Sequence, residues 1–255
     1  MLDKEVIVAK DLARKLGRIQ LNSFRKNLQI VRKSEKEFVT NIDMECQRVS
    51  NQILGKEFDY DIISEETKLQ SEISSDLFWV LDPIDGTHNY ISGLPIFGVS
   101  IALVSKDEFL LGIIYLPYFD EMYVGLKSKG ATLNNKPIRV SKNADIEKSM
   151  VNYDNQFHLE NSMFDNYMKI YPKTFTMRIT GSSIYDMSLI SRGIIDARIW
   201  NNTKPYDFSA GVVIIREAGG NITEFDGSPV TINSKKIIAS NGKIDRQIIN
   251  ILSQE

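Results

Sequence analysis

The chain has 255 residues, of which 42% are hydrophobic and 25% are charged. This length and composition are typical of a globular protein with one broad domain or two closely joined halves. The formal net charge of −2 at pH 7 excludes the overall positive field with which many proteins attract nucleic acid, so no nucleic-acid partner is expected.

The sequence favours a cytoplasmic protein. No stretch approaches the roughly 18 consecutive apolar residues of a membrane span, and the first residues lack the apolar segment of a signal peptide. Cys46 is the one cysteine, so no internal disulfide can form, as is usual in a reducing compartment. We therefore expect no membrane association and no export.

The first third of the chain predicts two helices. The first helix is amphipathic, because its apolar residues recur at three- and four-residue spacing: Val6, Ala9, Leu12, Ala13, Leu16 and Ile19. The polar segment 27–43 that follows should form a hairpin or loop, and a second helix is expected from about residue 44 to 54.

The middle of the chain changes to segments rich in Val, Ile, Leu and aromatic residues, which predict successive strands. A hairpin over 125–141 follows them, with turns at Gly130 and at Asn134-Asn135, and should form the edge of a mixed or antiparallel sheet. The predicted strands are 59–63, 77–82, 97–104, 109–117 and 121–126.

The last part of the chain alternates between strand and helix patterns, which predicts an α/β fold. We expect one catalytic unit with an N-terminal half over 1–145, a C-terminal half over 146–255 and a cleft between them. The predicted strands are 149–153, 174–179, 196–200, 221–225 and 235–240; the predicted helices are 162–170, 183–191, 208–218, which Gly219-Gly220 should end, and 245–252.

The segment Trp79–Tyr90 is the most informative part of the sequence. An apolar strand leads into Asp82, Pro83 cannot donate to a sheet ladder, and Gly86 allows an unusual backbone angle. Asp82 and Asp85 are therefore expected on a tight turn at a strand end. Such a turn is by itself more often structural than functional.

Further carboxylates strengthen a functional interpretation. Glu65 and Glu66 follow an apolar strand, and Asp43 and Asp207 each stand near a predicted helix start. Each alone could be a helix cap or a solvated loop residue. Together they form the oxygen-rich set that hard divalent cations such as Mg²⁺ prefer, and without a cation they would repel one another. Zinc is disfavoured, because the chain has only two His and one Cys.

Two segments closely resemble signatures of the inositol monophosphatase family. DPIDGTHNY is similar to D-P-(I/L)-D-G-T-x-N-(F/Y), and KPYDFSAGVVIIREAGG is similar to W-D-x-A-A-G-x-x-I-x-x-E-A-G-G. SEET and EFVTNID resemble two further family segments, and the likeness covers nearly the whole chain. It implies a layered αβαβα sandwich of the inositol monophosphatase/fructose-1,6-bisphosphatase type. It also implies a homodimer and a lithium-sensitive, Mg²⁺-dependent phosphatase.

The resemblance assigns metal ligands. Glu65, Asp82 and the carbonyl of Ile84 would hold a first ion, and Asp82, Asp85 and Asp207 a second. Glu65 would also touch a third, weaker ion. Two or three Mg²⁺ ions are thus implied, with Mn²⁺ able to substitute. Glu66, beside Glu65, would support the ligands from behind.

The resemblance also assigns catalytic and substrate-binding roles. Asp43 and Thr87 would orient and deprotonate the attacking water, with Glu65 beside them. The N–H groups of Gly86 and Thr87 would hold the phosphate. The remaining substrate contacts would come from Asp207 and from a loop that resembles the family's ring-binding G-(T/S)-A segment, namely Gly181, Ser182 and Ser183. The alternative for Ser182 is a plain helix N-cap, and both roles can hold at once.

Two departures from the family pattern bear on the substrate. Trp200 stands seven residues before Asp207, where typical members carry a Glu that binds inositol hydroxyls. A Trp cannot accept a hydrogen bond, although it can stack on a sugar or fill space. His88 stands where many members have Thr; it is either a loop histidine or a contact to the substrate.

The resulting expectation is hydrolysis of a small phosphorylated polyol or sugar by in-line attack of metal-activated water. Inositol 1-phosphate is the first expectation for the substrate. Fructose 1,6-bisphosphate, alone or in a dual activity, comes second, because some relatives without that Glu accept it, and histidinol phosphate comes third. GTHNY does not fit the G-T-K/R-E-F of nucleotide phosphatases. A non-catalytic regulatory module is disfavoured, because every ligand position is retained.

Overall fold

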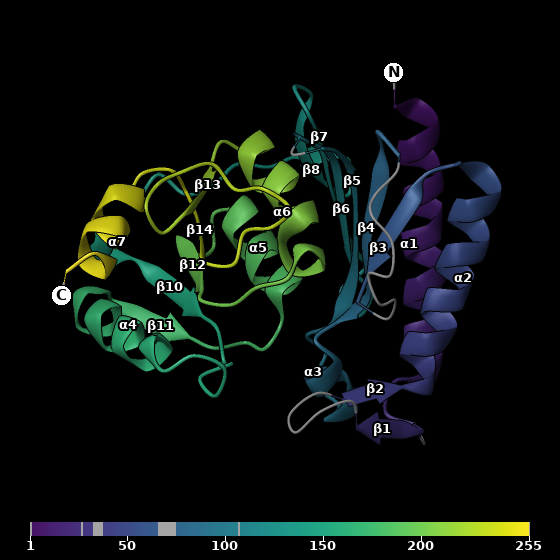
Figure 1. Ribbon diagram of the computed structural model, residues 1–255, viewed down its shortest axis with the longest axis horizontal. Helices are drawn as coiled ribbons and strands as arrows, with labels where there is room; N and C mark the ends of the chain where they lie inside the picture. The colour runs from purple at the N-terminus through teal and green to yellow at the C-terminus, as the bar shows by residue number, and fades with distance from the viewer. Residues whose placement is uncertain (1, 27, 33–37, 66–74, 107, 255) are drawn as a thin grey trace.

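The computed structural model describes residues 2–26, 28–32, 38–65, 75–106 and 108–254. Their helices and sheets alternate in five layers (Figure 1). This arrangement confirms the predicted αβαβα sandwich. The layers are, in order, α1 (Asp3–Ser23) with α2 (Asn41–Glu57), a seven-stranded sheet, α5 (Ser183–Ser191) with α6 (Pro205–Glu217), a five-stranded sheet, and α4 (Ser162–Ile170) with α7 (Asp245–Leu252).

The seven-stranded sheet has the order β3-β4-β5-β6-β7-β8-β9, so consecutive strands are neighbours. All its pairs are antiparallel except β3 with β4, which are parallel. The predicted hairpin forms its far edge as β8 and β9. The strands are β3 (Asp61–Ser64), β4 (Phe78–Asp85), β5 (Gly98–Ser105), β6 (Glu108–Leu116), β7 (Glu121–Leu126), β8 (Gly130–Leu133) and β9 (Lys136–Pro137).

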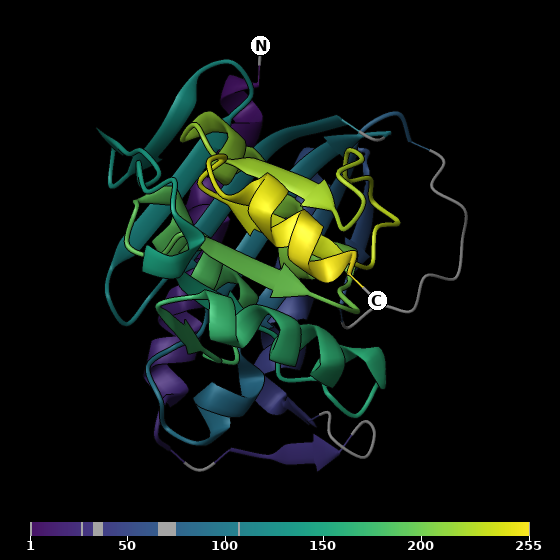
Figure 2. The ribbon, with the colours of Figure 1, turned by 90° about the vertical axis from the view of Figure 1, so that its left-hand side faces the viewer.

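The five-stranded sheet has the order β11-β10-β12-β14-β13. Its strand β10 (Met150–Tyr153) is parallel to both β11 (Thr176–Arg178) and β12 (Ala197–Trp200). The carboxyl ends of these three strands therefore share one edge. The antiparallel strands β13 (Asn221–Glu224) and β14 (Ile237–Ser240) complete the sheet, and Figure 2 shows α4 and α7 on its outer face.

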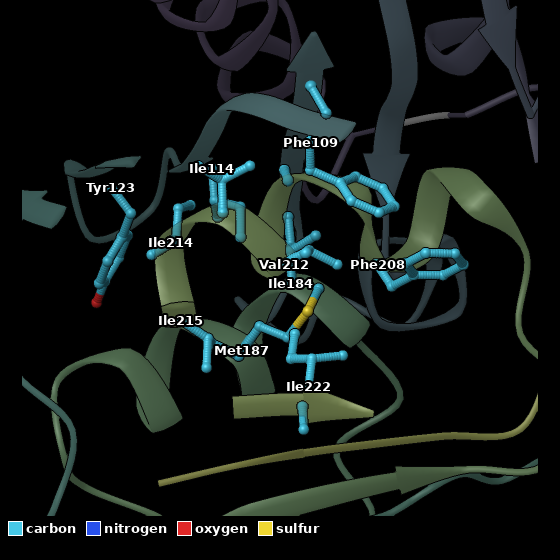
Figure 3. Close-up of a cluster of buried hydrophobic side chains, with 14 of the residues drawn as sticks. Phe109, Ile114, Tyr123, Ile184, Met187, Phe208, Val212, Ile214, Ile215 and Ile222 are labelled. Atoms are coloured by element: carbon cyan, nitrogen blue, oxygen red, sulfur yellow. The ribbon is translucent and has the colours of Figure 1, made fainter. Parts of the chain in front are cut away.

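Apolar side chains fill the spaces between the layers. One cluster lies between the two sheets, around α5 and α6, where Phe208, Val212 and Met187 meet Phe109 and Ile114 (Figure 3). A second packs α1 and α2 on the opposite face of the seven-stranded sheet, and a third packs α4 and α7 on the five-stranded sheet. Burial on both faces explains why β4 is apolar along most of its length.

Two glycines let α6 lie unusually close to the seven-stranded sheet. A Cβ added at Gly112 would come within 2.1 Å of the Ala210 carbonyl oxygen, and one at Gly125 within 2.7 Å of the Ile214 Cα. Any side chain at these positions would push the helix away. The glycines therefore set the distance between the sheet and α6, whose first turn carries Asp207.

Several predicted boundaries change in the structure. The prediction that the strand ends in a turn at Asp82 was wrong: β4 continues to Asp85, and its pairing with β5 shifts register between Asp82 and Asp85. The resulting bulge accommodates Pro83, which has no N–H for the ladder. The helix α3 (Thr87–Ile91) was not predicted, because five residues are too few for a periodic pattern.

The remaining elements agree with the sequence patterns apart from small shifts at their ends. The segment before α2 forms an antiparallel hairpin of β1 (Ile30–Arg32) and β2 (Phe38–Thr40). Two short 3₁₀ helices lie at Ile146–Lys148 and Tyr171–Lys173. Among the described residues, no helix is both long and apolar enough to cross a lipid bilayer.

Candidate active site

A cavity of about 580 Å³ lies where the end of β4 meets the first turns of α3, α5 and α6. The segment after β10 and the end of β12 close its other side. Its lining includes the predicted residues Glu65, Asp82, Ile84, Asp85, Gly86, Thr87, Gly181, Ser183 and Asp207. Segments far apart in the sequence thus converge on one site.

The bulge at the end of β4 directs both aspartates of the first signature toward this cavity. Asp82 is 2% exposed and Asp85 is 5% exposed, yet both line it. The Ile84 N–H donates to Oδ1 of Asp82 (3.0 Å), and the Gln20 side chain donates to the Pro83 carbonyl (2.8 Å). These bonds hold the backbone between the two aspartates in its irregular path.

The first turn of α6 positions Asp207. Pro205 opens the helix, and the Asp207 carboxylate accepts hydrogen bonds from the Lys204 N–H (2.8 Å) and the Thr203 hydroxyl (3.1 Å). The prediction that Asp207 stands near a helix start is confirmed. The helix begins three residues before the predicted start at 208, because Pro is well suited to a first helical position.

Asp82, Asp85 and Asp207 form a compact set of carboxylates. One oxygen from each lies within 4.8 Å of those of the other two. Burial raises the pKa of Asp85 to about 6 and that of Asp207 to about 7. Burial also raises the pKa of Asp82, and the charge of Glu65 adds to this increase. A bound cation would offset both the burial of these carboxylates and the repulsion between their charges. These hard oxygen donors therefore fit a divalent metal ion.

Thr87 links this cluster to Asp43. Its hydroxyl oxygen lies 3.0 Å from the Ile84 carbonyl oxygen and 3.1 Å from Oδ1 of Asp43. Asp43 is 1% exposed and completes the capping box of α2, where its Oδ2 accepts the N–H of the N-cap residue Thr40 (2.7 Å). Burial raises its pKa. Asp43 therefore lies behind Thr87 and reaches the cavity through that hydroxyl.

Gly86 makes the sharp change of direction between β4 and α3. Its φ is +83°, and an added Cβ would lie 2.6 Å from the Ile96 carbonyl oxygen. Only glycine fits both conditions without strain. The turn exposes the start of α3 to the cavity, where Gly86 and Thr87 both line the wall.

The predicted ring-binding loop contacts the metal-ligand candidate Asp85. The Ser182 hydroxyl donates to Oδ1 of Asp85, and the Ser183 N–H donates to Oδ2 (3.0 Å). Ser182 also accepts the Tyr185 N–H (3.3 Å) as the N-cap of α5, which confirms the capping alternative. Gly181 and Ser183 line the cavity, whereas Ser182 is buried behind Asp85.

Trp200 is 1% exposed and belongs to the apolar core between the sheets, although part of it lines the cavity. Its indole N–H donates to the Ser183 hydroxyl oxygen (3.2 Å), and the Arg198 guanidinium lies 4.6 Å from its ring centroid. His88 lies in α3 rather than in a loop, lines the cavity and packs edge-on against Phe38. Glu66 lies outside the described residues.

The structure adds cavity residues that the sequence analysis missed. Arg198, Asp154, Asn202 and His158 all line the wall next to Trp200. One signal could have found Asp154, because it directly follows the predicted strand 149–153. Arg198 carries no such signal, since a charged residue inside an apolar strand does not show which way it faces.

The whole chain, residues 1–255, matches the model of the inositol monophosphatase family. A fructose-1,6-bisphosphatase/inositol-1-monophosphatase of Aquifex aeolicus is 34% identical, over 98% of this chain and 96% of that protein. The Nus factor SuhB of Pasteurella multocida is 30% identical, over 95% of this chain and 93% of that protein. The solved structure of an inositol monophosphatase from Anabaena superposes with a TM-score of 0.88 at 28% identity, covering 98% of this chain and 96% of that one.

Fold, site and likeness together define a phosphatase, a hydrolase that acts on phosphorylated substrates. The chain belongs to the inositol monophosphatase family.

Proposed function

We propose that the protein is a Mg²⁺-dependent phosphomonoesterase for a small polyol or sugar phosphate, with inositol 1-phosphate as the first candidate substrate. The observation that carries this proposal is the convergence of Asp82, Asp85 and Asp207 in one cavity, together with Thr87, whose hydroxyl contacts the buried Asp43. The whole chain would form one catalytic unit, with halves over 1–145 and 146–255 contributing opposite walls.

Glu65, Asp82 and the Ile84 carbonyl would hold one metal ion, and Asp82, Asp85 and Asp207 another. Bound Mg²⁺ supplies positive charge that stabilises the phosphoryl oxygens and lowers the pKa of water. Two or three ions fit this set, with Mn²⁺ as a substitute and Li⁺ as an inhibitor. Glu66 would support the ligands next to Glu65.

The chain's own groups would position water and phosphate. Thr87 can accept a hydrogen bond from the attacking water while its own proton points to Asp43 or Ile84. Asp43 can take up the proton through this contact, because burial raises its pKa and favours the protonated form. Glu65 would lie beside the pair, and the Gly86 and Thr87 N–H groups would bind phosphate oxygens.

Fructose 1,6-bisphosphate is the second candidate substrate. Trp200 fills the position of the inositol-binding Glu, and the Aquifex aeolicus relative bears both activities in its name. Histidinol phosphate ranks third. The Pasteurella multocida relative is named a Nus factor, which supports a second, regulatory role of this chain in addition to catalysis. We further propose a cytoplasmic homodimer without a nucleic-acid partner.

Turnover of a panel of phosphate esters by the purified chain, with and without Mg²⁺, tests the proposal. We expect Mg²⁺-dependent release of phosphate, and loss of at least about a hundredfold in kcat for Asp82→Asn. Asp165→Asn on the exposed face of α4 removes the same charge elsewhere and serves as the control. Activity that persists in Asp82→Asn, or that needs no divalent ion, would contradict the mechanism.

A further inference from the structure

The structure places a carboxylate next to the position where the family's hydroxyl-binding Glu is missing. β10 and β12 are parallel, and Tyr153 pairs with Ile199. One residue further along both strands, Asp154 therefore lies beside Trp200 at the shared carboxyl edge. Asp154 is 5% exposed and lines the cavity, so its carboxylate can reach a ligand without facing bulk solvent.

Trp200 cannot take over the role of that Glu. Its indole N–H is engaged by the Ser183 hydroxyl oxygen, and the Arg198 guanidinium covers a face of its ring. Because Ser183 accepts from the indole, its own hydroxyl proton is directed elsewhere and can be donated to a substrate oxygen. Trp200 thus orients a donor, and the cavity needs its hydroxyl acceptor at another residue.

Arg198 places a positive charge beside Asp154. The guanidinium donates to the Asp186 carboxylate and to the Ser182 carbonyl (3.0 Å), and its other terminal nitrogen lies 4.0 Å from Oδ1 of Asp154. Asp186 is fully buried and is fixed in turn by Asn152 (2.6 Å) and Thr180 (2.7 Å). The Asn155 N–H donates to Oδ1 of Asp154 at 2.8 Å, so this carboxylate sits in a defined orientation.

The charge balance of this wall indicates which ligand chemistry it suits. Two carboxylates, Asp154 and Asp186, lie beside the single guanidinium of Arg198, so this cation is already paired. A second phosphate on the substrate would find this guanidinium already neutralised. Hydroxyl groups can instead donate to a carboxylate of this kind, and such charge-assisted hydrogen bonds are strong.

We propose that Asp154 is a specificity-determining residue that accepts hydrogen bonds from hydroxyl groups of the substrate's polyol or sugar ring. Arg198 supplies the positive charge beside it, and the Asn155 N–H orients it. The inference rests on the proposed phosphatase function of the same cavity. It explains how the site recognises a polyol although residue 200 is a Trp.

A pair of matched substrates tests this role. Inositol 1-phosphate and cyclohexyl phosphate share a six-membered ring, but only the first carries further hydroxyls. Asp154→Asn keeps the shape and removes the charge. We expect the ratio of kcat/KM for inositol 1-phosphate to that for cyclohexyl phosphate to fall about tenfold to a hundredfold, the value of hydrogen bonds to a charged group. The loss should be mainly in KM, because the contact exists before and during the reaction.

Each outcome decides between the alternatives. The ratio is taken on one preparation, so any unfolded protein cancels. The control Asp165→Asn should leave the ratio unchanged. An unchanged ratio in Asp154→Asn would overturn the inference. If kcat/KM falls equally for both substrates, the role of Asp154 is purely structural. If the unmodified enzyme with Mg²⁺ releases phosphate from none of inositol 1-phosphate, fructose 1,6-bisphosphate and histidinol phosphate, the proposed function itself fails.

Discussion

The hydroxyl oxygen of Thr87 lies 3.1 Å from Oδ1 of Asp43, although the two residues belong to different helices. The contact exists because Thr40 holds the Asp43 carboxylate at the start of α2 while Gly86 turns the chain into α3. A buried acid is thereby connected to the cavity through one hydroxyl. A residue in this position can pass a proton from water to carboxylate.

Replacement of Thr87 by Val should lower kcat by about a hundredfold to ten-thousandfold, the usual contribution of general base catalysis. Val has the same shape but no hydroxyl, so the link to Asp43 is lost. Thr87→Ser retains the hydroxyl and should keep most of the activity. Steady-state kinetics with saturating Mg²⁺ measures both variants; equal losses in Val and Ser would refute a role for the hydroxyl.

Ser182→Ala should weaken Mg²⁺ binding about tenfold to a hundredfold, because the Ser182 hydroxyl orients Asp85 from behind. It should also cost about 1 kcal/mol of folding free energy, because Ser182 caps α5. Calorimetric titration with Mg²⁺ and urea unfolding measure the two effects.

Ser188 on the same helix supplies the control for this variant. Its buried hydroxyl has no hydrogen-bond partner among the residues that the structure describes. Ser188→Ala should therefore leave Mg²⁺ affinity unchanged. If the two variants bind Mg²⁺ equally well, the Ser182–Asp85 contact does not support the metal site.

Gly86→Ala should destabilise the protein more than Gly130→Ala. Both glycines have positive φ, +83° and +85°, so both variants carry the cost of a left-handed backbone, about 1–2 kcal/mol. At Gly86 the new methyl group also meets the Ile96 carbonyl oxygen at 2.6 Å, whereas at Gly130 nothing lies within 4 Å. Steric overlap should add about 1–3 kcal/mol at Gly86. Urea unfolding measures the difference, and equal costs would contradict the clash.

The stability of the metal-free protein should fall as pH rises. Burial raises the folded-state pKa of Asp85 to about 6 and of Asp207 to about 7, above the ordinary aspartate pKa of 3.8. The folded state therefore holds more protons than the unfolded state between about pH 4 and 7, and its advantage is lost as these groups ionise. Thermal unfolding in EDTA from pH 5 to 8 should show a falling Tm.

Mg²⁺ should reverse this trend, because it binds the ionised carboxylates and favours their deprotonation. The increase in Tm on adding Mg²⁺ should be larger at pH 8 than at pH 5. Asp207→Asn removes one of the titrating groups, so its metal-free Tm should depend less on pH. A metal-free protein that gains stability over this range, or an unchanged slope in Asp207→Asn, would contradict the assignment.

Much of the site could be predicted from local sequence. Asp82 and Asp85 lie at the end of an apolar strand, and Asp207 lies in the first turn of a helix, so their types and approximate settings were visible in short segments. The family resemblance then related segments that no local pattern connects. The path of β4 was not predictable in the same way, because a bulge depends on how the neighbouring strand β5 pairs with it.

The part of the cavity wall around Trp200 depends on tertiary contacts. The sequence showed that Trp200 replaces an expected Glu, but it did not show that Trp200 donates to Ser183 or lies against Arg198. Nor did it show that Asp154 lies beside it. These relationships follow from the parallel pairing of β10 with β12, whose strands are separated by more than forty residues of chain.

By itself, the sequence determined the order and type of most elements and the carboxylates available for a metal, because periodicity and motif spacing are local properties of the chain. The tertiary structure decided which of these groups share a cavity, and what stands beside them. Close packing of α6 against Gly112 and Gly125 brings Asp207 to Asp85, and strand pairing brings Asp154 to Trp200. Such distances arise from burial and hydrogen bonding between remote segments, which local patterns do not encode.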